Sequence, residues 1–296
     1  MSQQIIVSNE YKLLREIGSG SFGEVYLAKN KENEKFAAKI EKKGTHSRLK
    51  DEYNFYKKLY TRGLKSGIPK IISFIETPEC NMLVMELLGK NLDELLEENG
   101  GIFDLSTVLK IGINIIDLLK CVHGVGFIHR DIKPNNFMTG YKSNSQNLYV
   151  VDFGLSKQYI NQKEHINFKI ERSLVGTARY ASINVHMGFE PSRRDDLEAV
   201  GYMLIYFLKG KLPWQGLKKD KNDDHVKLIG DVKMYTDIKK LCEDIPICFC
   251  TYISYCKKLQ FGETPDYNYL KKLFVNEAND QKIDLKYCWE QNNYKS

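Results

Sequence analysis

The stretch His-Arg-Asp-Ile-Lys-Pro-Asn-Asn at residues 129–136 decides how the rest of the chain is interpreted. This stretch contains an aspartate, a lysine and an asparagine within six consecutive positions. Asp-Phe-Gly follows at residues 152–154, after an apolar stretch at 148–151 that predicts a strand. These residue types are the ones needed to hold ATP-bound magnesium and to aim a hydroxyl group at the γ-phosphate.

Each polar residue of the two motifs has a predicted role. We expect Asp131 to accept or orient the proton of a substrate hydroxyl group and Lys133 to neutralise charge on the γ-phosphate. Asn136 and Asp152 are predicted to hold magnesium, because a hard cation prefers oxygen ligands. A capped turn at Asp131 and an Asx turn at Asp152 are the structural alternatives.

A glycine-rich stretch precedes these motifs. Gly-Ser-Gly-Ser-Phe-Gly at residues 18–23 lies between two predicted strands, at residues 11–17 and 25–29. Such glycines let a hairpin close over a triphosphate with its amides facing the oxygens. A flexible hairpin or a dinucleotide-binding turn gives the same pattern, but the latter needs a helix directly afterwards, where this chain predicts a strand.

Lys39 lies within a third predicted strand, at residues 36–40. An unpaired ammonium group in an apolar strand is costly, so Lys39 is expected to have an acidic partner. Glu52, on a helix predicted at residues 47–60, is the natural candidate, and the pair would direct Lys39 toward the α- and β-phosphates. The alternative is a lysine on an exposed face, which the surrounding motifs disfavour.

The pattern along the chain predicts an α+β protein with a small antiparallel β-rich lobe followed by a large, mainly helical lobe. Further strands are expected at residues 71–76 and 82–87, and helices dominate from residue 92. A helix at 105–122 is predicted with Ser106 as its N-cap, and the apolar run 197–208 predicts a helix buried on all sides. Residues 156–182 predict a long functional or disordered loop. The expected division is an N-terminal extension, a first lobe with one main helix and a hinge at its end, a second lobe and a C-terminal extension, at residues 1–10, 11–88, 89–285 and 286–296.

Composition restricts the class of protein without deciding its function. The net charge of +6 at pH 7 fits anionic partners such as phosphate, an acidic peptide or nucleic acid, and equally a lysine-rich surface. The seven cysteines lack the spacing of a zinc site and predict reduced thiols. No signal peptide, membrane anchor or nucleic-acid-binding motif is recognised, so we expect a protein of the cytoplasm or nucleus that does not bind nucleic acid.

Taken together, these motifs resemble the protein kinase family over roughly residues 11–285. The position of Lys133, two residues after Asp131, resembles the pattern of serine/threonine kinases. Where most kinases have Ala-Pro-Glu, this chain has Gly-Thr-Ala-Arg-Tyr-Ala-Ser-Ile-Asn at residues 176–184, which resembles the casein kinase 1 family. Ser-Arg-Arg-Asp-Asp-Leu-Glu, Leu-Pro-Trp-Gln-Gly-Leu and Pro-Asp-Tyr resemble it as well, at residues 192–198, 212–217 and 265–267.

The resemblance implies a two-lobed kinase fold that uses ATP and Mg²⁺. It implies that Ala37 and Leu88 flank the adenine, that Met85 lies behind it, and that Asp196 anchors the catalytic loop. Residues 86–88 would form the hinge. The ATP-binding residues implied in this way are Ile17, Gly18, Ser19, Gly20, Ser21, Phe22, Gly23, Val25, Ala37, Lys39, Met85, Glu86 and Leu88.

The resemblance also implies a class of substrate, namely proteins with a phosphorylated or acidic residue upstream of the target Ser or Thr. Arg179 matches a phosphate-binding arginine of the family, and Arg172 stands where a lysine is usual. Alternatively, both arginines only brace the loop against acidic neighbours. His225 takes the place of a third basic residue, and Asp223 and Asp224 add negative charge, so we expect weaker dependence on phosphate than is usual in the family.

The resemblance further implies regulation without activation-loop phosphorylation. Because the sequence contains no inhibitory tail after the catalytic region, we expect a constitutively active monomer. Two rival functions stay open from the sequence: a catalytically inactive kinase-like scaffold and a nucleic-acid-binding module. The intact Lys39, Asp131, Asn136 and Asp152 argue against the first, and the absence of a nucleic-acid-binding motif argues against the second.

Overall fold

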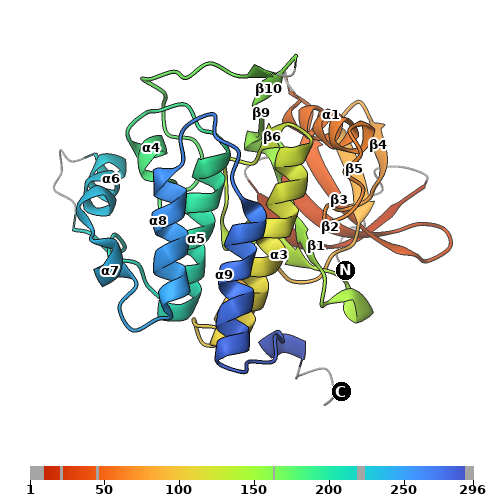
Figure 1. Cartoon of the computed structure of the whole chain (residues 1–296). Helices are drawn as coiled ribbons and strands as arrows, with labels where there is room; N and C mark the ends of the chain where they lie inside the picture. Colours follow the sequence, from red (N-terminus) through yellow and green to blue (C-terminus); the bar gives the residue numbers. More distant parts are fainter. Residues whose placement is uncertain (1–9, 21–22, 45–46, 163, 219–223, 291–296) are drawn as a thin grey trace. The chain divides into compact units, whose positions relative to one another are not determined.

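The computed structural model describes residues 10–20, 23–44, 47–162, 164–218 and 224–290 (Figure 1). It divides the chain into two compact units, one of Met1–Lys90 with Met138–Gly154 and one of Asn91–Phe137 with Leu155–Ser296. Sequence analysis placed the boundary near residues 88–89 and did not foresee that residues 138–154 belong to the first unit. Hydrogen bonds explain this grouping, since the Thr139 carbonyl accepts from the Gly89 amide at 2.8 Å and the Thr139 amide donates to the Lys90 carbonyl at 2.9 Å.

The first unit contains a five-stranded sheet in which all neighbouring strands are antiparallel (Figure 1). Each predicted strand is present, with ends that differ by up to three residues because backbone pairing continues beyond the apolar run. The order across the sheet is β1 (Lys12–Gly20), β2 (Gly23–Lys29), β3 (Lys35–Lys42), β5 (Cys80–Glu86) and β4 (Ile71–Glu76).

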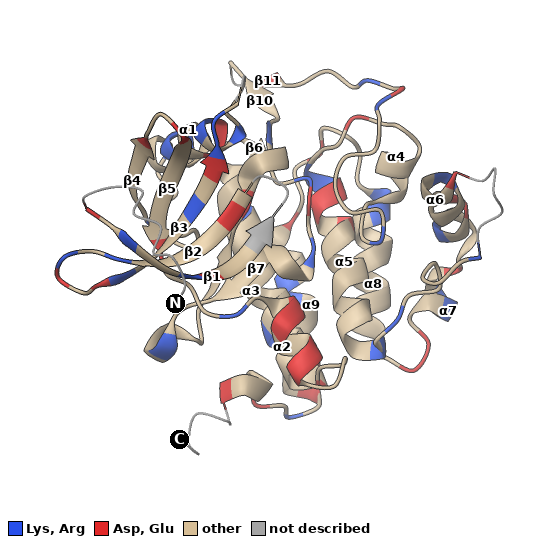
Figure 2. Ribbon diagram, turned by 180° about the vertical axis from the view of Figure 1, so that it is seen from behind, with Lys and Arg blue, Asp and Glu red and all other residues tan. Residues whose placement is uncertain are grey.

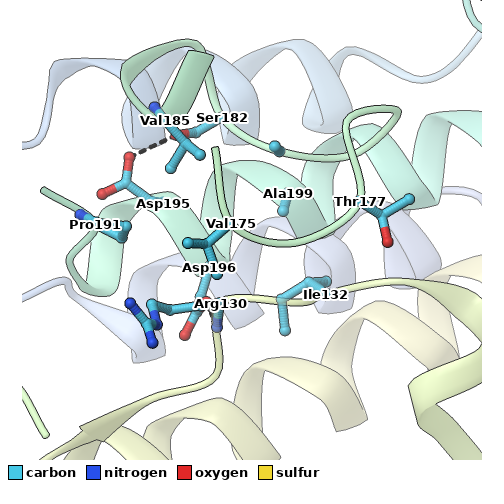
Figure 3. Close-up of a pocket in the computed structure, with 11 residues that line it drawn as sticks. Arg130, Ile132, Val175, Thr177, Ser182, Val185, Pro191, Asp195, Asp196 and Ala199 are labelled. Atoms are coloured by element: carbon cyan, nitrogen blue, oxygen red, sulfur yellow. Dashed lines mark hydrogen bonds between the residues drawn. The ribbon is translucent and has the colours of Figure 1, made fainter. Parts of the chain in front are cut away.

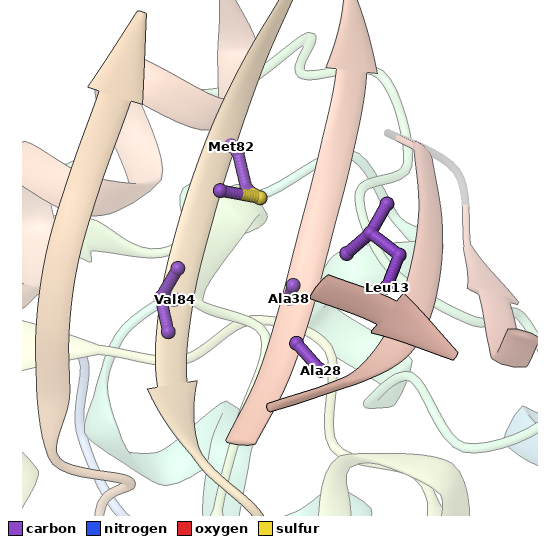
Figure 4. Packing of buried hydrophobic residues seen from close by; sticks show 5 residues of the cluster. All are labelled: Leu13, Ala28, Ala38, Met82 and Val84. Carbon is purple, nitrogen blue, oxygen red and sulfur yellow. The ribbon is translucent and has the colours of Figure 1, made fainter. Parts of the chain in front are cut away.

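The two faces of this sheet have different roles. Ala38 pairs with Val84 and, with Leu13, Ala28 and Met82, forms a buried apolar cluster (Figure 4). Because side chains alternate along a strand, the neighbours of Ala38 in sequence, Ala37 and Lys39, point to the other face. The sheet therefore separates an apolar core on one side from the predicted nucleotide-binding residues on the other.

Helix α1 (Arg48–Thr61) packs against β3, β4 and β5 and is the one main helix expected for this unit. Ser47 caps it, because its hydroxyl group accepts a hydrogen bond from the Lys50 amide at 3.1 Å. Leu49, Glu52, Tyr56 and Leu59 are buried at helical spacing. The buried stripe therefore carries one carboxylate, Glu52, into the unit.

The second unit is built mainly from helices, as expected. Helix α3 (Leu105–Gly124) packs against α5 (Arg193–Lys209) and α9 (Tyr267–Asp280), and α8 (Ile247–Lys258) packs against both α5 and α9 (Figure 1). Charged residues are confined to the ends of α5 and α8, and the apolar run predicted as a buried helix lies within α5 (Figure 2). The shorter helices are α2 (Leu92–Glu98), α4 (Ile183–His186), α6 (His225–Tyr235) and α7 (Ile238–Leu241).

The predicted N-cap of α3 was wrong. Asp104, with extended backbone angles, caps the helix by accepting a hydrogen bond from the Thr107 amide at 2.7 Å. The Ser106 hydroxyl group instead lies 2.8 Å from the Asp284 carbonyl oxygen and accepts a hydrogen bond from the Lys286 amide at 2.9 Å. Ser106 therefore holds the segment after α9 onto α3.

Residues 156–182 contain only short regular elements. Strand β9 (Lys157–Gln158) pairs with β6 (Phe127–Ile128), and β10 (Ile160–Asn161) pairs with β11 (Glu164–His165). Backbone hydrogen bonds hold the following residues, from the Arg172 amide to the Gly188 carbonyl and from the Glu190 amide to the Lys169 carbonyl, both at 2.8 Å. The remaining short elements are the strands β7 (Phe137–Thr139) and β8 (Leu148–Val150) and the 3-10 turns Pro134–Asn136, Lys142–Asn144 and Phe153–Leu155.

Within the part of the chain that the structure describes, no helix is both long and apolar enough to cross a membrane.

Candidate active site

Lys39 and Glu52 form the ion pair that the sequence predicted. Their Nζ and Oε2 atoms lie 2.6 Å apart, and the side chains are 10% and 3% exposed. Burial by itself lowers the pKa of Lys39, but the Glu52 and Asp152 carboxylates outweigh it and raise that pKa, so Lys39 stays charged. Burial raises the pKa of Glu52, and the Lys39 ammonium opposes this shift. A charged pair held this rigidly fixes the direction of the lysine side chain.

Strand register gathers several predicted ATP-binding residues around Lys39. Val25 on β2 lies opposite Lys39, and Ala37 lies opposite Met85 on β5. Directly paired residues share a face of the sheet, and so do residues two apart on one strand. Val25, Ala37, Lys39 and Met85 therefore share one face, the arrangement expected for the wall of a nucleotide site.

The glycine-rich hairpin joins β1 and β2, with Gly18 paired to Val25 and Gly20 to Gly23. Ile17 and Ser19 belong to β1. Gly23 has a φ of +142°, and a Cβ atom there would lie 2.0 Å from the Ile40 carbonyl oxygen, so only glycine fits. The predicted residues Ser21 and Phe22 lie outside the described residues.

The predicted hinge begins where β5 ends. The Glu86 amide donates to the Lys70 carbonyl at 2.8 Å, and the Glu86 carboxylate accepts from the Lys70 amide at 3.1 Å. Leu88 is 8% exposed, and a Cβ atom at Gly89 would lie 2.4 Å from the Thr139 hydroxyl oxygen. These contacts fix the backbone of this segment within the first unit.

Asp152 lies in the first unit, as do Lys39 and Glu52. It adopts a positive φ of 60°, and its Oδ1 accepts a hydrogen bond from the Gly154 amide at 3.3 Å, which is the Asx turn considered as an alternative. The Phe153 ring stacks on Phe55 and meets Tyr56 edge-on, each with centroids 5.3 Å apart. Helix α1 therefore contacts the Asp-Phe-Gly motif as well as Lys39, so one helix positions both groups.

In the second unit, Asp131 is the centre of a hydrogen-bond network. Its Oδ2 lies 2.7 Å from Lys133 Nζ, its Oδ1 accepts from the Thr177 hydroxyl group at 2.8 Å, and the Asn136 amide nitrogen donates to its carbonyl oxygen at 2.8 Å. Asp131 is 6% exposed. The network fixes the carboxylate in one orientation, as general base catalysis requires.

Asn136 and Asp152 offer a donor set that suits magnesium. The nitrogen of the Asn136 amide faces Asp131, which turns its oxygen away, and no described residue donates to that oxygen. Asp152 supplies a carboxylate, and hard cations such as Mg²⁺ prefer amide and carboxylate oxygens. The two residues belong to different units, and their joint use of one ion stays a prediction.

Asp196 anchors the catalytic loop, as the resemblance implied. It accepts hydrogen bonds from the His129 amide at 2.7 Å and the Arg130 amide at 2.8 Å, and it lies 2.9 Å from His123 Nε2. Burial would raise the pKa of Asp196, but these donors outweigh it and lower that pKa. Arg130 adopts a positive φ of 68°, a strained conformation that Asp196 holds in place.

The segment around Thr177 closes onto this loop. A Cβ atom at Gly176 would lie 2.3 Å from the Arg130 carbonyl oxygen, so the two stretches of backbone touch. A small cavity of about 20 Å³ lies beside them and is lined by Arg130, Thr177, Asp195 and Asp196, among others (Figure 3). At its edge the Ser182 hydroxyl group donates to Asp195 at 2.6 Å, which ties this segment to α5.

A larger hollow of about 460 Å³ opens on the other side of Thr177. Lys133, Arg179 and His225 line it, and so does the carboxylate of Asp93, which accepts a hydrogen bond from Asn135 at 3.0 Å. The pocket thus contains two basic side chains and a histidine, and one of the basic side chains is Lys133, the lysine beside Asp131. Asp224 uses its carboxylate to cap α6, and Asp223 lies outside the described residues.

Arg172 does not line this pocket. Its Nε atom lies 3.5 Å from Glu190, a carboxylate that is 1% exposed and that also pairs with Lys157 at 2.6 Å. This contact is the loop-bracing arrangement that the sequence left open as an alternative. That Arg172 recognises phosphate stays a prediction, and the two arginines contact different groups.

Several residues of this site were not assigned a role from the sequence. Thr177 binds Asp131 from a loop that is far away in the chain, and His123 and Trp214 support Asp196 and the Arg179 carbonyl. Lys233, a buried residue of α6, was not assigned a role either. In the sequence its spacing of four residues from the apolar Ile229 is the one signal that it faces inward. Contacts between distant loops leave no pattern in a single sequence.

A comparison with known protein families finds a match that covers the residues of both motifs. The family model of the protein kinase domain matches residues 11–257, which include the glycine-rich hairpin, Lys39, the catalytic loop and Asp-Phe-Gly. The antiparallel sheet of the first unit and the helical second unit are the parts expected of the two-lobed kinase fold. The chain therefore belongs to the protein kinase family.

Proposed function

We propose that this kinase is a serine/threonine kinase of the casein kinase 1 type. It transfers the γ-phosphate of ATP to Ser or Thr residues that follow an acidic or phosphorylated residue. The observation that carries this proposal is the basic pocket beside Asp131, in which Lys133 and Arg179 lie together. The position of Lys133 two residues after Asp131 supports Ser/Thr as the acceptor.

The residues divide the chemistry among them. Asp131 accepts the proton of the substrate hydroxyl group while the oxygen of that hydroxyl group attacks the γ-phosphorus of ATP. The bond between the γ-phosphorus and the oxygen of the departing ADP breaks. Lys133 balances charge on the transferred phosphoryl group, and Lys39, held by Glu52, binds the α- and β-phosphates. Asn136 and Asp152 would each offer an oxygen ligand to magnesium, which would neutralise phosphate charge when bound.

The charges of the pocket support an anionic substrate of moderate affinity. Arg179 lies over the rings of Tyr180 and Tyr206, with its guanidinium carbon 5.8 and 5.5 Å from their centroids, and these contacts favour one direction of its side chain. Each charge-assisted hydrogen bond to a phosphate contributes roughly 1.5–3 kcal/mol. Asp93 opposes this attraction, although its bond from Asn135 occupies one carboxylate oxygen.

The contacts of Glu190 support activity without activation-loop phosphorylation. This buried carboxylate pairs with Lys157, near the start of the irregular segment at residues 156–182, and with Arg172, farther along the same segment. A carboxylate within the chain thus supplies negative charge to the basic residues of the segment. We propose that the kinase is constitutively active and acts as a monomer.

The test is phosphate transfer from Mg-ATP to three matched peptides, with phosphoserine, aspartate or alanine three residues before the target serine. Asp131→Asn is the blank. Fastest transfer to the phosphoserine peptide, absent in the blank, supports the proposal. Equal transfer to all three peptides would retain the kinase and reject the anion site. ATP binding without transfer would favour a catalytically inactive scaffold, and salt-sensitive DNA binding without turnover would favour a nucleic-acid-binding module.

His225 makes the anion site testable in this chain. A lysine at its position adds a permanent positive charge to the pocket that contains Arg179. We expect His225→Lys to increase the preference for the phosphoserine peptide over the alanine peptide by about tenfold or more. His225→Gln, which adds no charge, is the matched control. An unchanged preference in the lysine variant would exclude this pocket as the phosphate site.

A further inference from the structure

A buried lysine of α6 grips the backbone of the segment that carries Thr177 and Arg179. Lys233 is 2% exposed, and its Nζ donates to the Ala178 carbonyl at 2.8 Å and to the Ala181 carbonyl at 2.6 Å. The amides of Tyr180 and Ala181 both donate to the Thr177 carbonyl, at 2.9 and 3.0 Å. The segment is therefore a tight turn, and two of its carbonyl groups accept hydrogen bonds from the same ammonium group.

Aromatic rings, and not a carboxylate, surround this ammonium group. Lys233 Nζ lies 5.1 Å from the centroid of the Tyr202 ring and 5.0 Å from that of Trp214, and the two rings meet edge-on. No carboxylate of the described residues forms an ion pair with it. Glu198 acts on it only at longer range, and burial lowers the pKa of Lys233 to about 7.

A buried ammonium group without an ion-pair partner is costly to fold. The cation–π contacts with Tyr202 and Trp214 offset only part of that cost. A leucine or methionine at this position would avoid the cost but would remove the lysine donor from the carbonyl groups of Ala178 and Ala181. Burying the lysine therefore costs folding free energy, but its two hydrogen bonds hold the turn in place.

Neighbouring side chains hold the same turn from other directions. Trp214 Nε1 donates to the Arg179 carbonyl at 2.7 Å, and His186 Nε2 lies 3.0 Å from the Ala178 carbonyl oxygen. Helix α6 approaches His186 closely, because a Cβ atom at Gly230 would lie 2.9 Å from the His186 Cβ. Lys233 is the group that joins the two ends of the turn.

The turn connects two functional parts of the second unit. Its first residue, Thr177, donates to Asp131, and Arg179 at its middle lines the basic pocket. A shift of the turn would move the donor to the catalytic carboxylate and the arginine of the pocket together. We infer that Lys233 is a positioning residue that sets the geometry of Asp131 and of the substrate pocket through the carbonyls of Ala178 and Ala181. This inference rests on the proposed function, because it concerns the same site.

The test compares Lys233→Met, which removes the donors, with Lys233→Arg, which keeps them, and with Lys227→Met, an exposed lysine of the same helix, as the matched control. We expect Lys233→Met to lower kcat/KM for the peptide by about tenfold or more. The affinity for ATP, measured without peptide, should stay unchanged. Lys233→Arg should retain most of the wild-type kcat/KM for the peptide, and Lys227→Met should match the wild type.

Hydrogen exchange of residues 177–182 gives a readout that needs no activity. It should become faster in Lys233→Met while exchange in the centre of α3 stays the same. If Lys233→Met does not fold, Lys233→Leu, which also lacks a donor, takes its place. Unchanged exchange and kcat/KM would overturn the inference, and so would an equal loss of peptide turnover and ATP affinity. A wild-type protein that transfers no phosphate would reject the proposed function, whereas the exchange comparison would still decide the role of Lys233.

Discussion

At the scale of single residues, the Lys39–Glu52 pair makes each partner depend on the other. Breaking a buried pair leaves an uncompensated charge, so we expect Glu52→Gln to destabilise the protein by roughly 3–5 kcal/mol and to weaken the use of ATP. Denaturant unfolding and kcat/KM for ATP measure both effects. Glu76→Gln is the matched control, because its partner Lys50 lies at 3.1 Å on an exposed surface, where a pair contributes about 0–1 kcal/mol. Equal losses in the two variants would contradict the prediction.

The same scale shows why some site residues were predicted and others were not. Lys39 and Glu52 were paired from the sequence because an apolar strand makes a lone ammonium group implausible. Asp131 was found through its neighbours in the motif. Thr177 and Lys233 carried no such argument, since their partners are a carboxylate and two backbone carbonyls that only the folded chain brings near.

At the scale of elements, the start of α3 separates two roles that a serine and an aspartate can both fill. Asp104 caps the helix, so Asp104→Ala should cost about 0.5–2 kcal/mol and speed hydrogen exchange of the Thr107 amide. Ser106→Ala should instead speed exchange of the Lys286 amide, which donates to the serine hydroxyl group. The two variants serve as controls for each other. Faster exchange of Thr107 in the Ser106 variant would restore serine as the cap.

The elements themselves were largely predictable, and their ends were not. Strands followed the apolar runs, but residues such as Gly20 and Gly23 joined them through backbone pairing, which the side chains do not signal. Ser106 was predicted as the cap of the helix at residues 105–122, whereas the helix begins directly after its actual cap, Asp104. The assignment of residues 138–154 to the first unit depends on hydrogen bonds such as that from Val150 to Gly67, which join distant parts of the chain.

At the scale of the whole molecule, buried ionisable groups should leave a signature in the pH dependence of stability. Burial raises the pKa of Asp195 from 3.8 to about 6, although Ser182 and the Ser192 amide donate to it. Between these two pKa values the folded state binds more protons than the unfolded state. The stability that Asp195 contributes is therefore fully present below about pH 4 and is lost as the pH rises through about 6.

His186 has the opposite effect on stability. Burial lowers the pKa of His186 from 6.5 to about 4, so the stability that His186 contributes grows as the pH rises through this range. The wild-type slope alone cannot separate the two groups, but a difference between variants can. We expect the free energy of unfolding of Asp195→Asn, relative to the wild type, to improve by up to roughly 3 kcal/mol between pH 4 and pH 7. Denaturant unfolding at several pH values measures this difference. His186→Gln should show the reverse trend relative to the wild type, because the neutral variant loses a group that favours folding more as the pH rises. A difference curve for Asp195→Asn that stays flat across this range would mean that Asp195 titrates at the same pH in the folded and unfolded protein.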